Sequence, residues 1–167
     1  PEQAEILYAD IVAALAPSVD LLLFETMSSV AQAEGALRAA SKAALPVWLA
    51  ISVDDVDGTR LRSGEPLIAL APMLQRSAPA ALLINCSRPE VVTAGLDIVA
   101  TFGTPFGAYA NGFTQITEAF INGPQTVDKL TQRRDLDPSA YARFAMQWLD
   151  QGASIVGGCC EIGPAHI

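Results

Sequence analysis

Three cysteines offer the chemistry that stands out most in this sequence. Cys86 follows the apolar run ALLIN, and Cys159 and Cys160 stand side by side after SIVGG. Three thiolates can occupy three corners of a zinc tetrahedron, and a catalytic zinc site keeps the fourth corner open for water or substrate. Thiolates favour zinc over magnesium or calcium because they are soft ligands. We expect Gly157 and Gly158 to let the backbone turn tightly, so that both adjacent side chains face one ion.

Other roles for these thiols stay open at this point. A single cysteine at the end of a strand, such as Cys86, is usually a small buried hydrophobic residue. A redox-active pair is a further alternative, although the Cys-x-x-Cys spacing typical of such pairs is absent from the chain. A disulfide framework fits poorly, because adjacent cysteines rarely reach ordinary disulfide geometry. Free thiols favour a reducing, cytoplasmic location.

Two further polar side chains end apolar runs. Glu25 ends DLLLFE, and Asn111 ends FGAYAN. If these runs are parallel strands, their carboxyl ends meet the cysteines at one face, where (β/α)8-barrel enzymes build their active sites. Both residues are therefore candidate binding residues. Each also has a simpler explanation, since Glu25 could cap the following helix and Asn111 could shape a turn before Gly112.

Five short apolar runs predict the strands that must position these side chains. They are nearly continuous in hydrophobicity rather than alternating, which is typical of parallel strands covered on both faces. The runs lie at residues 20–25, 47–53, 81–86, 106–111 and 154–159. Helical segments between them indicate right-handed βα units.

Capping residues predict where two of the helices begin. Asp137 can cap the clearest one, with Pro138 in its first turn and Gly152 at its end. Ser87 and Glu90 stand in capping-box positions before another helix.

Length limits the architecture. The chain has 167 residues, whereas a whole (β/α)8 barrel takes about 250. We therefore expect an α/β fold in which residues 1–167 form a single domain: an incomplete, C-terminal portion of a TIM-type barrel with about five βα units, truncated at both ends. An open doubly wound sheet is the alternative, but no Gly-rich phosphate loop follows any predicted strand.

Charge and hydropathy limit the partners. The net charge is −8 and the basic residues are scattered singly, which argues against nucleic acid as a partner. No apolar run approaches the roughly 18–20 residues of a membrane span. A small-molecule ligand fits this composition better, and the oligomeric state cannot be deduced from it.

The closing stretch IVGGCCEIGPAHI resembles the most specific signature of the homocysteine S-methyltransferases, a family of zinc-dependent (β/α)8 barrels. LLLFETMSS, LLINCS and AYANGF resemble three other segments of that family, in the same order along the chain. The resemblance implies that Cys86, Cys159 and Cys160 bind Zn²⁺. It further implies that Glu25 binds the amino group of homocysteine and that Asn111 lies near the metal, filling its open corner when substrate is absent.

The resemblance also implies an enzyme that transfers a methyl group to the thiol of homocysteine and produces methionine. Relatives use S-methylmethionine, betaine, S-adenosylmethionine or methylfolate through cobalamin as the methyl donor, and the sequence does not select among them. We expect residues 112–137, a long insertion, to cover the donor pocket. His166, the only histidine, is expected to be structural.

Departures from the family pattern keep two alternatives open. Glu161, Ile162 and Gly163 replace the usual residues between the cysteine pair and Pro164, and Ala110 replaces the usual proline before Asn111. An incomplete barrel would also leave strand edges unpaired. The chain could then be a catalytically inactive barrel fragment that needs a partner segment, or a thiol redox protein.

Overall fold

Five parallel strands form one sheet in the described part of the chain, in the sequential order β1-β2-β3-β4-β5. The computed structural model describes residues 1–167 apart from the side chain of residue 118. The strands are β1 (Leu22–Met27), β2 (Val47–Ile51), β3 (Ala81–Asn85), β4 (Phe106–Ala110) and β5 (Ile155–Gly158). A doubly wound sheet reverses its strand order at a switch point. The sequential order is instead that of a barrel wall, so the predicted α/β class is confirmed.

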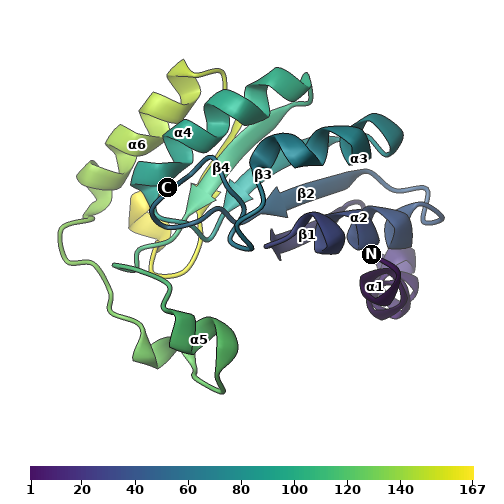
Figure 1. Ribbon diagram of the computed structural model, residues 1–167. Helices are drawn as coiled ribbons and strands as arrows, with labels where there is room; N and C mark the ends of the chain where they lie inside the picture. The colour runs from purple at the N-terminus through teal and green to yellow at the C-terminus, as the bar shows by residue number, and fades with distance from the viewer.

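Helices alternate with these strands and cover one side of the curved sheet (Figure 1). They are α1 (Glu2–Leu15), α2 (Val30–Ala40), α3 (Ala71–Arg76), α4 (Pro89–Val99), α5 (Glu118–Asn122) and α6 (Pro138–Asp150). The short helix α5 is the exception, because it extends away from the sheet after β4 (Figure 1). Among the described residues, no helix combines the length and the hydrophobicity that a membrane crossing requires.

Both faces of the sheet bury apolar side chains. Leu49, Leu82 and Ile84 belong to the main core between the sheet and the helices. Ala50 and Leu83 belong to a separate cluster on the other face, where Trp48 and Tyr109 pack against them. All five residues of β3 are buried, which explains why its sequence is a continuous apolar run.

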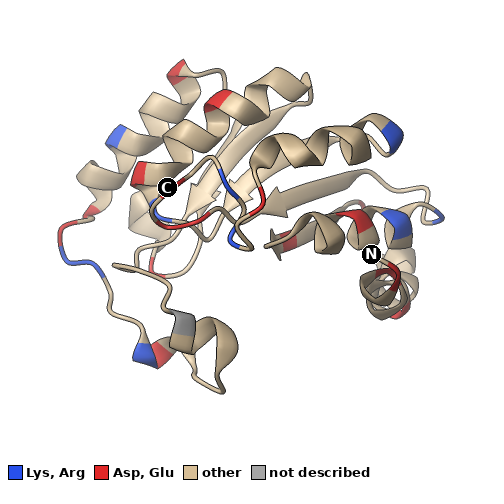
Figure 2. Cartoon of the chain, viewed as in Figure 1, with Lys and Arg blue, Asp and Glu red and all other residues tan. Residues whose placement is uncertain are grey.

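Charged side chains are dispersed over helices and loops (Figure 2). Lys and Arg are scattered among Asp and Glu in this view and do not gather on one face. Many of the ion pairs are local, such as Arg38 with Glu34 at 2.7 Å on α2.

The helix ends match the sequence prediction in one case and not in the other. Asp137 caps α6, accepting a hydrogen bond from the Ala140 N–H at 2.7 Å, and Gly152 follows the helix with φ +98°. The predicted capping box at Ser87 and Glu90 is wrong, because α4 begins after Arg88 without a side-chain cap. Ser87 is fully buried, and its hydroxyl accepts from the Val53 N–H and donates to the Asn85 carbonyl, each at 2.9 Å.

Candidate metal centre

The three cysteines come together at the carboxyl end of the sheet. Cys86 follows β3 directly, and Cys159 and Cys160 follow β5. Their sulfur atoms all lie within 4.8 Å of one another, and the sulfurs of Cys159 and Cys160 are 3.9 Å apart. All three are free thiols. Two loops 73 positions apart in sequence, counted from Cys86 to Cys159, therefore deliver one cluster of sulfur donors.

The strand between them, β4, and the residues just after it hold all three cysteines through the backbone. The Tyr109 carbonyl accepts from the N–H of Cys86 at 3.2 Å, and the Ala110 carbonyl accepts from the N–H of Cys159 at 2.9 Å. The Cys160 carbonyl in turn accepts from the Gly112 N–H at 2.8 Å. The relative placement of the thiols is thus fixed by hydrogen bonds that continue the parallel ladder past the ends of the strands.

The paired glycines do not make the predicted turn. Gly157 and Gly158 lie within β5, and the left-handed residue comes later, at Glu161 with φ +64°. A Cβ at Gly158 would lie 2.2 Å from Cγ2 and 2.7 Å from Cβ of Ile162. Glycine is needed here because the chain folds back closely on the strand after the cysteine pair, and the predicted explanation is wrong.

Electrostatics favours one thiolate in the cluster when no cation is bound. The hydrogen bond from Cys159 lowers the pKa of Cys86 to about 6, against the opposing effect of burial, and the Asn111 amide and the charge of Arg62 add to the lowering. The pKa of Cys159 is raised by that same hydrogen bond and by burial. Burial and then the charge of Cys86 raise the pKa of Cys160. Three thiolates can therefore coexist here only beside a cation.

Asn111 is fully buried beside this cluster. Its side-chain nitrogen Nδ2 donates to the sulfur of Cys86 at 3.9 Å, while its oxygen Oδ1 accepts from the Phe113 N–H at 3.1 Å. The amide therefore presents a donor to the sulfur rather than an oxygen ligand. It also forms the turn after β4, as the structural explanation of Asn111 expects.

Glu25 lies within β1, which runs two residues past the predicted end to Met27. Its Oε1 accepts a hydrogen bond from the hydroxyl of Tyr109 at 3.0 Å. The alternative role of Glu25 as a helix cap is wrong, because the Oγ of Ser29 caps α2. Burial, followed by the charge of Glu25, raises the pKa of Tyr109, and Cys159 and Cys86 contribute further. The Tyr109 side chain thus contacts the carboxylate, while its backbone carbonyl holds Cys86.

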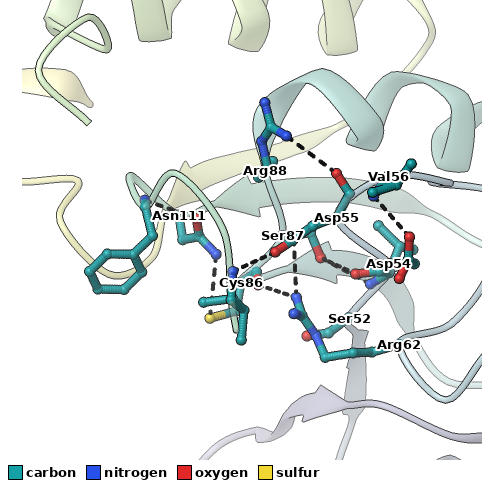
Figure 3. Close-up of polar contacts among 12 residues, drawn as sticks. Ser52, Asp54, Asp55, Val56, Arg62, Cys86, Ser87, Arg88 and Asn111 are labelled. Atoms are coloured by element: carbon teal, nitrogen blue, oxygen red, sulfur yellow. Dashed lines mark hydrogen bonds and ion pairs between the residues drawn. The ribbon is translucent and has the colours of Figure 1, made fainter. Parts of the chain in front are cut away.

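Two charged residues near the cluster escape sequence reasoning. Arg62 and Asp55 form a buried ion pair, and Arg62 contacts the backbone of Cys86 (Figure 3). Both come from the stretch DDVDGTRLR, whose composition is typical of a solvated loop. A pattern of charges does not reveal which members turn inward, so this stretch carried no usable signal.

His166 bonds to the backbone through both ring nitrogens. Nδ1 accepts from the Gly163 N–H at 3.2 Å, and Nε2 lies 3.3 Å from the Leu136 carbonyl. Its ring also packs edge-on against Tyr141. These contacts agree with the structural role expected for the single histidine.

Solved structures confirm the partial-barrel architecture. The metallated form of the homocysteine methyltransferase MmuM from Escherichia coli matches with a TM-score of 0.74 and 24% identity, over 99% of this chain and 49% of that chain. The carboxyl transferase domain of Rhizobium etli pyruvate carboxylase, in complex with pyruvate and carrying Y628A, matches with a TM-score of 0.56 and 11% identity, over 96% of this chain and 24% of that chain. Both likenesses bear on the fold alone.

Sequence comparisons identify the family. The family model for homocysteine S-methyltransferase matches residues 2–167. Homocysteine S-methyltransferase 1 of Zea mays is 26% identical over 155 residues, covering 89% of this chain and 44% of the relative. Selenocysteine Se-methyltransferase of Brassica oleracea var. italica is 27% identical over 154 residues, covering 89% of this chain and 41% of the relative. The chain spans less than half the length of these curated relatives. Because the family model extends over nearly the whole sequence, the chain belongs to the homocysteine S-methyltransferase family.

Proposed function

We propose that this chain takes part in methyl transfer to the thiol of homocysteine, giving methionine, at a zinc site formed by Cys86, Cys159 and Cys160. The observation that carries the proposal is the convergence of three sulfur atoms within 4.8 Å at the carboxyl end of a barrel wall. Family membership supplies the class of reaction. The chain spans less than half the length of its curated relatives. The activity of the whole protein is therefore also part of this proposal.

The donor set fits zinc. Zinc–sulfur bonds of about 2.3 Å in a tetrahedral site separate the sulfurs by about 3.8 Å. The 3.9 Å between the sulfurs of Cys159 and Cys160 is close to this value. Three thiolates from the protein leave one corner for a ligand from the substrate, which is the arrangement of a catalytic rather than a structural site. When bound, zinc would favour the thiolate form of the homocysteine sulfur at neutral pH.

The protein's own residues would orient the amino acid. Glu25 places an exposed carboxylate on the inner side of β1, where it can accept hydrogen bonds from the ammonium group of homocysteine. The Tyr109 hydroxyl fixes one oxygen of that carboxylate. The side-chain amide of Asn111 donates a hydrogen bond to the sulfur of Cys86. These contacts restrict the geometry of the site before the substrate arrives, which lowers the entropic cost of reaching the reactive arrangement.

The reaction balances without an oxidant or a reductant. The thiol proton of homocysteine leaves to solvent, and the sulfur lone pair forms a bond to the methyl carbon of the donor. The bond between that carbon and the donor breaks, and its electron pair stays with the donor. Methionine and the demethylated donor are the products. Residues 112–137, which follow Asn111, are the segment that we assign to the donor side of the site.

Metal analysis tests the site. Protein purified under reducing conditions should contain about one zinc ion per chain. Cys86→Ala and Cys159→Ala should each lose it, whereas Asp128→Asn, which changes an exposed carboxylate far along the 112–137 segment, should keep it. A metal-free protein with a reversible two-electron thiol couple would instead favour the redox alternative.

Turnover tests the reaction. Zinc-loaded protein is incubated with homocysteine and each of the four donor classes, and methionine is measured by mass spectrometry. Methionine formed with one donor supports the proposal. Zinc binding without turnover by the chain alone, followed by turnover once the remaining part of a relative's barrel is supplied, would support the fragment alternative. No methionine under either condition would reject the methyl-transfer assignment.

A further inference from the structure

A buried ion pair lies beside the backbone of Cys86. The Arg62 guanidinium nitrogen Nη2 is 3.5 Å from Oδ1 of Asp55, and the side chains are only 10% and 5% exposed (Figure 3). Both residues belong to the segment that follows β2, whereas Cys86 follows β3. Burying two charges is unfavourable unless other hydrogen bonds also satisfy them. The other hydrogen-bond partners of Arg62 and Asp55 therefore indicate the role of the ion pair.

Arg62 uses the same nitrogen to hold the backbone of Cys86. Nη2 donates to the Cys86 carbonyl oxygen at 3.0 Å. Cys86 has φ +47°, a left-handed conformation that residues other than glycine rarely adopt. In the described residues the partner of this carbonyl is a side chain rather than a ladder N–H. The guanidinium thus stabilises a strained turn that aims the thiol at the other two cysteines.

Asp55 uses its second oxygen to hold the loop after β4. Its Oδ2 accepts a hydrogen bond from the Ile116 N–H at 2.6 Å. Ile116 belongs to the segment 112–137. One buried carboxylate therefore joins the β2 loop, the Cys86 turn and the start of that segment.

We propose that Arg62 is a positioning residue for Cys86, and that Asp55 orients Arg62 while anchoring the start of residues 112–137. The inference rests on the proposed role of Cys86 as a metal ligand. It predicts that changes at these two positions, neither of which contacts the metal, alter zinc affinity through the geometry of the cysteine cluster. Groups that orient metal ligands from behind typically change metal affinity by about 10- to 100-fold when they are replaced.

Zinc affinity measured by competition with a chromophoric chelator tests the role of Arg62. Arg62→Met keeps an unbranched stem and removes every donor, and should weaken zinc binding about tenfold. The matched control is Arg60→Met in the same loop, where Arg60 is half-exposed and contacts Asp57 and the Gly64 carbonyl. It should bind zinc like the parent chain. Arg62→Lys, which restores a charged donor, should fall between Arg62→Met and the parent. Arg62→Met with parental zinc affinity would overturn the proposal.

Cobalt spectroscopy gives a readout that general destabilisation would not produce. Co²⁺ replaces zinc in thiolate sites, and its thiolate charge-transfer and d–d bands report ligand number and geometry. The bands should shift or weaken in Arg62→Met and stay unchanged in Arg60→Met, under conditions in which both variants show the circular dichroism of the folded chain. Unchanged bands in Arg62→Met would count against the role of Arg62.

Two substitutions at Asp55 separate its two roles. Asp55→Asn is isosteric and keeps an acceptor for the Ile116 N–H, so it should weaken zinc binding but leave residues 112–137 as resistant to trypsin as in the parent. Asp55→Ala should weaken zinc binding and also speed cleavage at Lys129. Asp55→Asn also serves as the test if Arg62→Met does not fold, and parental zinc affinity in this variant would overturn the proposal.

The parent chain separates failure of this inference from failure of the proposed function. If the parent binds zinc and the variants bind it equally well, only the positioning role is wrong. If the parent binds no zinc under reducing conditions, the proposed function fails and the inference fails with it.

Discussion

The hydroxyl of Tyr109 donates a hydrogen bond to Oε1 of Glu25 at 3.0 Å, although the two residues are 84 positions apart in the chain. They meet because β1 and β4 both turn these side chains toward the inner face of the curved sheet. The same strand, β4, also holds the backbones of Cys86 and Cys159. The group proposed to bind the substrate's ammonium and the proposed metal ligands are therefore positioned by one element.

Removing this hydroxyl should weaken homocysteine binding. A hydrogen bond to a charged group contributes about 1.5–3 kcal/mol, and the exposure of Glu25 favours the lower end, so Tyr109→Phe should raise the Kd for homocysteine about tenfold. Zinc content should not change. Isothermal titration of the zinc-loaded chain measures the effect. Tyr8→Phe is the control, since the Tyr8 hydroxyl donates to the sulfur of Met27, at 3.6 Å, rather than to Glu25. Equal affinities in the two variants would contradict an orienting role for Tyr109.

Cys86 should be the first thiol to react in metal-free, reduced protein. Its pKa of about 6 makes it mostly thiolate at pH 7, whereas the pKa values of Cys159 and Cys160 are raised and those thiols stay protonated. Because the lowered pKa belongs to an acid, the thiolate and its reactivity should be lost as the pH falls through about 6. Iodoacetamide labelling at pH 5 and pH 7, followed by peptide mass spectrometry, measures the rate at which each cysteine reacts. Faster labelling of the more exposed Cys160 at pH 7 would show that access outweighs ionisation.

Zinc should stabilise the folded chain. A ligand that binds only the native state at a hundredfold excess over its Kd adds about 2.7 kcal/mol to the free energy of unfolding. Thermal unfolding of the reduced chain should therefore shift to higher temperature with zinc and return with a chelator. Cys86→Ala should show little of this response. A zinc-dependent rise of equal size in that variant would indicate that the ion binds elsewhere.

Gly158→Ala should disturb the cysteine pair, whereas Gly163→Ala should not. The added methyl group at position 158 would lie 2.7 Å from Cβ of Ile162, which no rotamer change can move away. At position 163 no atom lies within 4 Å of the added carbon. We expect Gly158→Ala to cost about 1–3 kcal/mol in denaturant unfolding, together with a loss of zinc affinity. Equal stability in the two variants would mean that the chain after Cys160 shifts freely.

Short-range patterns located the five strands of this fold correctly. The continuous apolar runs located all five strands because a parallel strand buried on both faces needs no polar alternation. Asp137 and Gly152 marked the ends of α6 because capping depends on neighbouring backbone groups. The Ser87 prediction failed for the opposite reason. A buried hydroxyl satisfies whichever backbone groups the fold places beside it, and here these are the Val53 N–H, just after β2, and the Asn85 carbonyl of β3.

The sequence by itself determined the residue types of the candidate site: three cysteines, Glu25 and Asn111, each at or near the end of an apolar run. Only the tertiary structure decided that the three sulfurs meet, that Tyr109 contacts Glu25, and that Arg62 and Asp55 turn inward behind Cys86. The physical reason is that hydrophobic periodicity and capping are local, so they can be read from neighbouring residues. Contacts between the ends of different strands depend on strand order and register, which the packing of the whole sheet sets.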